Sequence, residues 1–461
     1  MSDSSRSSDA TDAVAPRPGI AGRLSRLIQL DTTSSRVVEH GIAGFEELFE
    51  ELYPLVHGRL ERERVGERGI LYRLPGATDA DPIVLMGHFD TVPAEETEAW
   101  RHPPFSGAIE GGVVHGRGAI DDKGALVVLF DAVENLLAAG ATPARTVYLS
   151  LGGDEETNGT AAQTIAEELH ARGIRPWLVL DEGGAIIDGV LPGLPYRSAV
   201  VGLGEKGVLS VTLTASAPAG HASTPSRTPS APLRIARALA RLSRNPFPKR
   251  LNTTSRRMFE AYRGVARGPI GQALVTLVPA LGPVSAQLLS RLGGEPAAMV
   301  QTTVAATVLA GGTVPNVIPD TASAVLNLRI ALGETVAGTL ARLRRVIRDP
   351  AISFAVLESH EPSPESRMDS PQWRLIEDAV STAYPGTLTV PYVMLAASDA
   401  RHFHRYTPDA TYRLAPLAMS AAERAALHGV NERVTVDALE RGERFYRHLL
   451  RHLPAEKHLP V

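Results

Sequence analysis

The sequence contains no cysteine among its 461 residues. This absence excludes a disulfide scaffold, a thiolate metal site and a cysteine nucleophile. Any metal ion must therefore be held by His, Asp and Glu side chains. Lysine is scarce too: Lys123, Lys206, Lys249 and Lys457 are the only four among 47 Lys and Arg residues. Lys123 and Lys206 lie inside motifs quoted below.

Strong net charge and long apolar runs are also missing. The formal charge of −4 excludes the field needed to bind nucleic acid or a membrane surface. No run of about 18 apolar residues is uninterrupted, as a membrane span requires. Residues 1–19 are rich in Ser, Asp, Ala and Pro and predict a disordered tail, not a targeting signal. We expect a soluble cytoplasmic protein with no membrane span and no nucleic-acid partner.

The first half of the chain alternates between helical and strand patterns. Helical spacing covers 21–60, and continuous apolar runs bounded by Pro and Gly are typical of buried parallel strands. This alternation predicts an α/β, doubly wound domain with a mostly parallel sheet. The expected strands are 69–74, 83–86, 145–152 and 176–184, and the expected helices are 124–140 and 160–173.

The pattern changes after Lys206. Strands expected at 207–217, 322–332 and 352–357, with helices at 231–244 and 335–348, predict a smaller α+β domain. The last segment begins and ends with a helix and is expected to rejoin the first domain. The predicted organisation is a disordered tail at 1–19, a catalytic domain at 20–206 and 360–461, and an inserted lid or dimerisation domain at 207–359.

One segment of the inserted domain gives little pattern. Residues 245–309 are rich in Pro, Gly and Ala, and only a few helical turns can be placed there. Within them, the apolar stretch 271–289 has two interpretations: it lines an acyl-binding pocket, or it forms the core of an enlarged lid. We favour the core, because large buried apolar stretches usually serve packing.

Polar residues follow the predicted buried strands, where open α/β sheets bind ligands. His88 and Asp90 follow the strand 83–86; they suit a metal ligand and the carboxylate that orients it, or simple structural hydrogen bonding. Asp121 and Asp122 lie on a Gly-rich turn before a helix. One of them could bridge two cations, or cap the helix.

Three consecutive acids, Asp154, Glu155 and Glu156, follow another strand. Their repulsion is relieved by a cation, or they complement a helix dipole. Together, imidazoles and carboxylates without cysteine fit a divalent metal such as zinc, and two metals about 4 Å apart would activate water and polarise a carbonyl. Two more groups, each typical of a solvated loop when taken singly, are Asp181 with Glu182, and His428 with Asn431 and Glu432.

From about residue 21 to 453 the sequence resembles the di-zinc aminoacylase and carboxypeptidase family. Within it, the chain is most similar to the branch of carboxypeptidase S and the N-fatty-acyl-amino-acid synthase/hydrolases. Ten motifs in order carry this resemblance: GHFDTVP, GRGAIDDKG, GDEETNG, LDEGG, GEKG, GHASTP, GGTVPNVIP, LNLRI, SDARHF and HGVNE.

The resemblance implies two Zn²⁺ ions. His88, Asp121 and Asp181 would hold one ion, and Asp121, Glu156 and His428 the other, so Asp121 would bridge. The ligand types alone allow other divalent metals.

The resemblance also assigns the catalytic roles. Asp90 would orient His88, and Glu155 would be the general base. The peptide between Asp121 and Asp122 would be cis. His221 would stabilise the oxyanion, and its action across a subunit interface would require a homodimer.

For the substrate carboxylate, the resemblance points to Asn316 and Arg329, with Arg401 a weaker candidate. An Arg fork matches a carboxylate bidentately. From its strand alone, Arg329 would be interpreted as an ordinary surface arginine.

The expected function is zinc-dependent hydrolysis of the amide between an acyl or peptidyl group and an amino acid with a free carboxylate. The substrate would be an N-acyl amino acid or short peptide, and the reverse condensation is mechanistically allowed. The alternatives are a narrower deacylase, such as a desuccinylase, a dipeptidase, or a binding protein of the same fold without catalysis.

Overall fold

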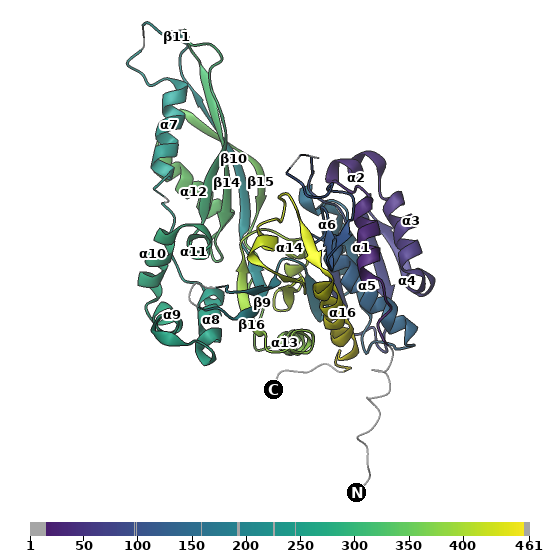
Figure 1. Cartoon of the computed structure of the whole chain (residues 1–461). Helices are drawn as coiled ribbons and strands as arrows, with labels where there is room; N and C mark the ends of the chain where they lie inside the picture. The colour runs from purple at the N-terminus through teal and green to yellow at the C-terminus, as the bar shows by residue number, and fades with distance from the viewer. Residues whose placement is uncertain are drawn as a thin grey trace. The chain divides into compact units, whose positions relative to one another are not determined.

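A computed structural model describes residues 15–455, except 96, 98, 158, 191–193, 225 and 245. The chain forms two compact units (Figure 1). Unit 1 contains Met1–Leu203, Glu365–Tyr392 and Ser398–Val461, and unit 2 contains Gly204–Pro364 and Val393–Ala397. The insertion expected at 207–359 falls inside unit 2; the roles of the two units as catalytic domain and lid stay predictions.

The large sheet has a parallel centre. Its strand order is β1-β2-β6-β3-β7-β17-β9-β8-β18, with β16 also paired to β9. β6, β3, β7 and β17 are mutually parallel, while β1 with β2, β2 with β6, and β9 with β8 and β17 pair in antiparallel fashion. Every residue of β3 is buried, as its continuous apolar run predicts. The strands are β1 Glu61–Val65, β2 Gly69–Leu74, β3 Ile83–His88, β6 Val147–Gly152, β7 Leu178–Asp181, β8 Ala185–Asp188, β9 Arg197–Glu205, β16 Leu388–Met394, β17 Thr411–Arg413 and β18 Ala418–Met419.

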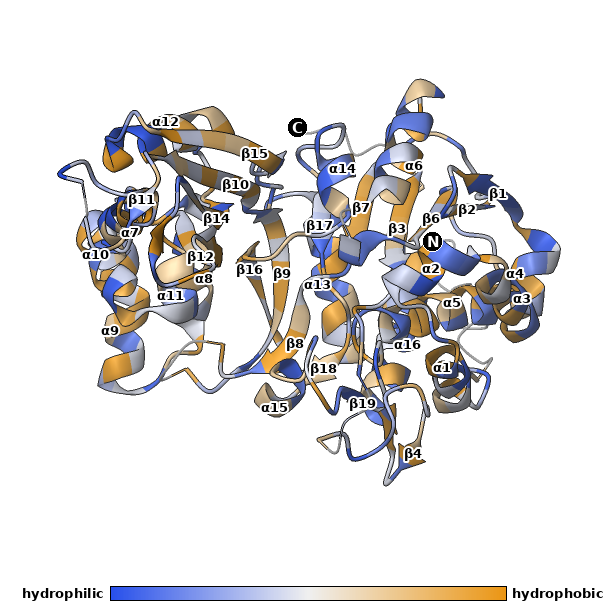
Figure 2. Cartoon of the chain, turned by 90° about the horizontal axis from the view of Figure 1, so that it is seen from above, coloured by the Kyte–Doolittle hydropathy of each residue, from blue (hydrophilic) through white to orange (hydrophobic). Residues whose placement is uncertain are grey.

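Helices cover both faces of this sheet (Figure 2). α6 and α14 pack on one face, where Ile165 and Phe403 meet Val84 and Met86 of β3. α5 packs on the other face, with α1 and α16 against it. The doubly wound α/β prediction is therefore confirmed. The helices are α1 Ile20–Gln29, α2 Ser34–His40, α3 Ala43–Leu52, α4 Pro54–Arg59, α5 Lys123–Ala138, α6 Thr160–Ala171, α13 Pro371–Ala383, α14 Ala400–His404, α15 Ala421–Arg424 and α16 Val436–Arg451.

The N-terminal boundary of the ordered chain differs from the prediction. Of the tail predicted at 1–19, residues 1–14 lie outside the described residues. Arg17 is held in place: its backbone N–H donates to Asn135 Oδ1 at 3.0 Å, and its guanidinium donates to Leu52 O at 2.7 Å. Ordered contacts thus begin before α1. No described helix has both the length and the apolar character needed to cross a membrane.

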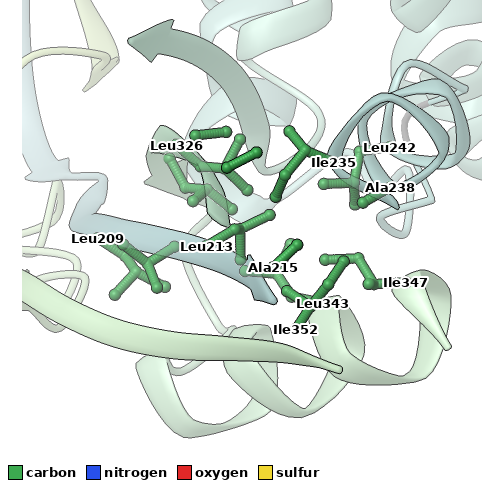
Figure 3. Close-up of a cluster of buried hydrophobic side chains, with 14 of the residues drawn as sticks. Leu209, Leu213, Ala215, Ile235, Ala238, Leu242, Leu326, Leu343, Ile347 and Ile352 are labelled. Carbon is green, nitrogen blue, oxygen red and sulfur yellow. The ribbon is translucent and has the colours of Figure 1, made fainter. Parts of the chain in front are cut away.

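Unit 2 is built on an antiparallel sheet in the order β12-β14-β10-β15. α7 and α12 pack against it, and the core joins Leu213 and Leu326 of the sheet to Ile235 and Leu343 of the helices (Figure 3). β10 alternates buried and half-buried residues along much of its length, as its period-two pattern predicts. The elements are β10 Gly207–Ser216, β11 Gly220–His221, α7 Ala231–Leu242, β12 Thr303–Ala310, β13 Val317–Ile318, β14 Thr321–Ile330, α12 Val336–Ile347 and β15 Ile352–His360.

The segment 245–309 holds far more helix than expected: α8 Thr253–Ala261, α9 Gly268–Ala280, α10 Gly282–Leu292 and α11 Gly294–Ala298. The core interpretation of 271–289 is wrong for four of its large side chains, because Leu277, Leu281, Val284 and Leu288 are 47 to 56% exposed. The buried residues of α9 and α10 are Val275, Pro279 and small residues such as Gly271, Ser285 and Ala286. The acyl-pocket interpretation stays a prediction.

Because side chains in unit 2 differ in burial, replacing them with Ala should lower the free energy of unfolding by different amounts. Leu326→Ala removes a side chain that is 1% exposed, and should lower the free energy of unfolding by about 2–5 kcal/mol. Leu288→Ala, at a position that is 56% exposed, should change it by no more than about 0.5 kcal/mol. Denaturant unfolding followed by circular dichroism measures both. Equal losses would contradict the assigned packing of α10.

Candidate metal centre

The predicted site residues meet at the carboxyl ends of parallel strands. His88 ends β3 and Asp181 ends β7. β6 ends at Gly152, the register partner of His88, and a 3₁₀ turn at Glu155–Thr157 follows. Asp121 comes two residues before the start of α5. The sheet therefore brings segments that are distant in sequence to the edge where α/β folds bind ligands.

Asp121 lies between two histidines. Its Oδ1 is 3.0 Å from His88 Nε2, and its Oδ2 is 3.0 Å from His428 Nε2. His428 Nε2 is also 3.3 Å from Glu156 Oε1. Ligand atoms of His88, Asp121 and Glu156 all lie within 4.8 Å of one another. One carboxylate that offers a separate oxygen to each imidazole has the arrangement of a bridging ligand.

Asp90 connects His88 to the 3₁₀ turn. His88 Nδ1 is 3.1 Å from Asp90 O and 3.3 Å from Asp90 Oδ1. The Asp90 carboxylate accepts hydrogen bonds from the backbone N–H groups of Glu155 and Glu156 at 3.1 and 3.2 Å, and from Ser34 Oγ at 2.9 Å. A carboxylate on the second ring nitrogen fixes the orientation and tautomer of a metal-binding histidine. The contact predicted between Asp90 and His88 is present; its part in catalysis stays a prediction.

The histidines supply positive charge to this cluster. Burial opposes it, but hydrogen bonds with Asp121 and Asp90 still raise the pKa of His88 well above its usual value. Hydrogen bonds to Asp121 and Glu156 raise the pKa of His428 to about 10. Burial acts to raise the pKa of Asp121, yet His428 and His88 hold it below the usual range. The ionised carboxylate of Asp121 therefore favours the binding of a cation.

The acids around this cluster outnumber its histidines. Burial, reinforced by Asp399, Asp121 and Glu156, raises the pKa of Glu155 well above its usual value. Burial and the charges of Asp121 and Asp181 do the same for Glu182. Glu156 Oε1 is buried and lies 3.3 Å from His428 Nε2. This donor set fits divalent cations, which relieve carboxylate repulsion and accept oxygen and imidazole ligands.

Four of the five predicted metal ligands are linked by contacts: Asp121 contacts His88 and His428, and His428 contacts Glu156. Asp181 is buried at the neighbouring strand end, close enough to His88 for their charges to interact. Its Oδ2 accepts a hydrogen bond from the Ala400 N–H at 2.6 Å. The ligand role of each of these residues stays a prediction. The peptide between Asp121 and Asp122 is cis, as the resemblance implies.

Glu432 is an important residue that the sequence reasoning missed. We interpreted it, taken singly, as part of a solvated loop, yet its side chain is fully buried. It accepts hydrogen bonds from Arg117 Nη1 at 2.6 Å and from the N–H groups of Gly118, Ile120 and Asp121 at 3.1, 2.9 and 3.2 Å. Glu432 therefore shapes the turn that presents Asp121. Its position in the motif HGVNE was the only available signal.

Asp399 was missed as well, although it lies in the motif SDARHF. A side chain at Gly152 or Gly159 would place its Cβ 2.9 or 2.0 Å from the Asp399 carboxylate, so both glycines make room for it. Burial raises the pKa of Asp399 to about 7. Arg401, the weaker candidate for substrate binding, has its guanidinium 4.0 Å from Asp399 and donates to Ser398 O at 2.8 Å.

The other predicted residues belong to unit 2. His221, on β11, is exposed, and its Nδ1 accepts from Ser223 N at 3.2 Å. The N–H of Ala222 donates to Asn316 O at 3.0 Å, so His221 and Asn316 lie on adjoining segments. Arg329 is half-buried on β14. The oxyanion and substrate roles of these three residues stay predictions.

A family pattern described as "Peptidase family M20/M25/M40" matches residues 84–452, well over half of the chain. The chain belongs to this family. The predicted resemblance and the prediction of an enzyme are thus confirmed: the chain is a hydrolase of a metallopeptidase family that uses a divalent metal.

Relatives match over nearly the whole chain. The zebrafish (Danio rerio) "N-fatty-acyl-amino acid synthase/hydrolase PM20D1.1" is 34% identical over 92% of this chain and 83% of its own length. Human "N-fatty-acyl-amino acid synthase/hydrolase PM20D1" is 31% identical, covering 94% and 88%. "Probable carboxypeptidase S-like 2" of Dictyostelium discoideum is 31% identical, covering 90% and 80%.

Solved structures share the fold. An M20 family metallo-carboxypeptidase, Sso-CP2 from Sulfolobus solfataricus, aligns with a TM-score of 0.71 at 16% identity, over 94% of this chain and 99% of its own. Human carnosine dipeptidase 1 aligns with a TM-score of 0.66 at 14% identity, covering 94% and 95%. At these identities the likeness shows the fold alone.

The buried contacts of Glu432 predict that it controls metal affinity through Asp121. Glu432→Gln keeps the shape of the side chain but removes the negative charge of the carboxylate, which accepts hydrogen bonds from four N–H groups. It should weaken metal binding by about 10- to 100-fold. Elemental analysis after dialysis against buffered zinc measures this. Glu440→Gln, at an exposed position of α16, is the matched control and should retain its metal. Equal metal content in both variants would contradict the role of Glu432.

The raised pKa values of His88 and His428 predict proton release on metal binding. Both imidazoles are protonated at neutral pH in the metal-free protein, and a metal ligand must be neutral, so binding should release about two protons from them. Metal affinity should fall as pH falls. Calorimetry in buffers of different ionisation enthalpy counts the protons, and His428→Gln should release about one fewer. Binding heats that do not depend on the buffer would exclude this coupling.

Proposed function

We propose that the protein is a zinc-dependent amidohydrolase that cleaves the amide between an acyl or peptidyl group and an amino acid with a free carboxylate. The observation that carries this proposal is the placement of Asp121 between His88 and His428, with Glu155 on the adjoining turn. The metallopeptidase family and the names of the relatives support the reaction class.

Two Zn²⁺ ions are proposed as the cofactor. His88, Asp121 and Asp181 would hold one, and Asp121, Glu156 and His428 the other. Bound there, divalent metals would polarise the amide carbonyl and increase the acidity of a water molecule. The contacts of Asp121 with both histidines support its role as the shared ligand.

Glu155 is proposed to move the proton. Its backbone N–H is anchored on Asp90 Oδ1 at 3.1 Å, which fixes the turn beside His88. Burial raises the pKa of its carboxyl group well above the usual value. A carboxyl group with a raised pKa can accept a proton from the attacking water and donate it to the leaving amine near neutral pH.

The roles in unit 2 are part of this proposal. His221 would stabilise the oxyanion, and Asn316 and Arg329 would bind the substrate carboxylate, with Arg401 of unit 1 as a further candidate. The guanidinium of Arg329 suits this because its planar fork pairs with a carboxylate bidentately. Action of His221 across an interface would make the protein a homodimer. A cytoplasmic location likewise stays a prediction.

N-acyl amino acids are proposed as the substrate class. The relatives named N-fatty-acyl-amino acid synthase/hydrolases cover most of the chain at 31–34% identity, and this supports hydrolysis and also the reverse condensation. The carboxypeptidase S-like relative supports short peptides as the second substrate class.

Replacement of the proposed base provides the test. Glu155→Gln should keep the fold and the bound metal but lower kcat by about 10²- to 10⁴-fold, because the water loses its proton acceptor. Hydrolysis of N-acyl amino acids of increasing chain length, and of dipeptides, is followed by mass spectrometry of the released amine. The same substrates with an amidated carboxyl group are the matched control and should react poorly.

Three outcomes would contradict the proposal or one of its parts. Wild-type protein with its metal bound that releases no amine from any substrate would exclude amide hydrolysis of this class. Full activity in Glu155→Gln would exclude Glu155 as the base. Equal rates for free and amidated substrates would remove the carboxylate requirement, and with it the roles of Asn316 and Arg329.

A further inference from the structure

A second group of metal-binding side chains lies in unit 1, apart from the Asp121 centre. His102, Glu110 and His115 each offer a ligand atom, and the three atoms lie within 4.8 Å of one another. Glu110 and His115 belong to a small sheet in the order β19-β5-β4, formed by β4 Ile109–Glu110, β5 Val113–His115 and β19 Arg433–Thr435. The labels of β4 and β19 mark this sheet in Figure 2.

The hairpin geometry explains why these residues meet. Glu110 pairs with Val113, and the N–H of His115 donates to Ala108 O at 2.8 Å. Because side chains alternate along a strand, Glu110 and His115 project from the same face of the hairpin. His102 reaches this face from the preceding loop, which Arg117 anchors by donating its N–H to Pro104 O at 2.8 Å.

We propose that His102, Glu110 and His115 form an additional binding site for one divalent transition-metal ion of the zinc class. His102 Nε2 is 3.2 Å from Glu110 Oε2, and the two imidazole rings are 4.7 Å apart between centroids. Metal–ligand bonds of about 2.0–2.2 Å in tetrahedral geometry place two ligand atoms about 3.3 Å apart. His102 and Glu110 already have this spacing, and the ligand atom of His115 lies within 4.8 Å of both.

The ligand types match this class of ion. Two imidazoles and one carboxylate form a known zinc ligand set that leaves the fourth position to water. Hard ions such as Mg²⁺ prefer all-oxygen ligands and are disfavoured.

Two arginines next to the proposed site lower its affinity for a metal ion. Arg101 Nη2 lies 2.7 Å from Glu110 Oε2, and Arg433 is the cross-strand partner of His115. The pair of Arg101 and Glu110 is exposed on both sides, so it stabilises the protein little and a metal can displace it. Both cations still repel a metal ion. The additional site is therefore weaker than the carboxylate-rich centre at Asp121.

A metal here would act on structure rather than on catalysis. It would join the loop containing His102 to the β4–β5 hairpin. Next to His102, the N–H of Arg101 donates to Asn431 Oδ1 at 2.7 Å, and Asn431 Nδ2 donates to Ala99 O at 2.9 Å. Asn431 is three residues from His428. The ion would thus stabilise the loop that presents His428.

Zinc stoichiometry of the full-length protein tests this proposal. Metal-stripped protein is titrated with Zn²⁺ by calorimetry, and its metal content is measured after dialysis against buffered zinc. Wild type should bind one equivalent more than His102→Ala or Glu110→Gln, whose affinity for that equivalent should fall by at least about 10- to 100-fold. Arg101→Ala should strengthen the same binding event, because a competing cation is removed. His40→Ala, at an exposed histidine elsewhere in unit 1, should match wild type.

The difference between wild type and His102→Ala does not depend on the Asp121 centre, so it is informative even if the proposed hydrolysis fails. Equal zinc stoichiometry and affinity in wild type, His102→Ala and Glu110→Gln would overturn the proposal. So would weaker binding in Arg101→Ala. Circular dichroism confirms that each variant is folded, and Glu110→Gln, a conservative change at an exposed position, provides the decisive comparison if His102→Ala is unstable.

Discussion

The concentration of negative charge at the carboxyl ends of β3, β6 and β7 is the constraint on which the rest of unit 1 depends. Carboxylates placed so close together repel one another unless each has donors and the group has cations. The chain provides both. Backbone N–H groups bind Asp90 and Glu432, and the imidazoles of His88 and His428 bind Asp121. Loops that look irregular along the sequence are arranged to supply these donors.

The sequence predicted those parts of the centre whose signal is local. A polar residue directly after a buried strand, such as His88, or on a Gly-rich turn before a helix, such as Asp121, is visible in the sequence. Glu432 and Asp399 were missed, because their burial depends on distant segments: Glu432 contacts Arg117, 315 residues away. The helices of 245–309 were missed for a related reason, since α9 and α10 expose leucines such as Leu277 and Leu288 and so lack the usual pattern.

Two of the four lysines, Lys123 and Lys206, have a common structural use. Lys123 Nζ donates to Leu27 O and Leu30 O at 2.9 and 2.8 Å, and Lys206 Nζ donates to Ala298 O and Gln301 O at 3.0 and 2.8 Å. Burial lowers the pKa of both to about 7. A compact ammonium with three donors can bind two carbonyl groups where the planar fork of Arg does not fit. At these two positions, where carbonyl groups converge, this Arg-rich chain has Lys.

Asp121 and His428 are 307 residues apart in the sequence, yet one carboxylate oxygen joins them. A metal ion at this point would close a loop comprising most of the chain, because its proposed ligands come from both the N-terminal and the C-terminal part of unit 1. A ligand that binds only the folded state stabilises it in proportion to the logarithm of its free concentration. Metal supply would therefore set the lifetime of the protein as well as its activity, and in metal-poor surroundings the chain would be more easily unfolded and degraded.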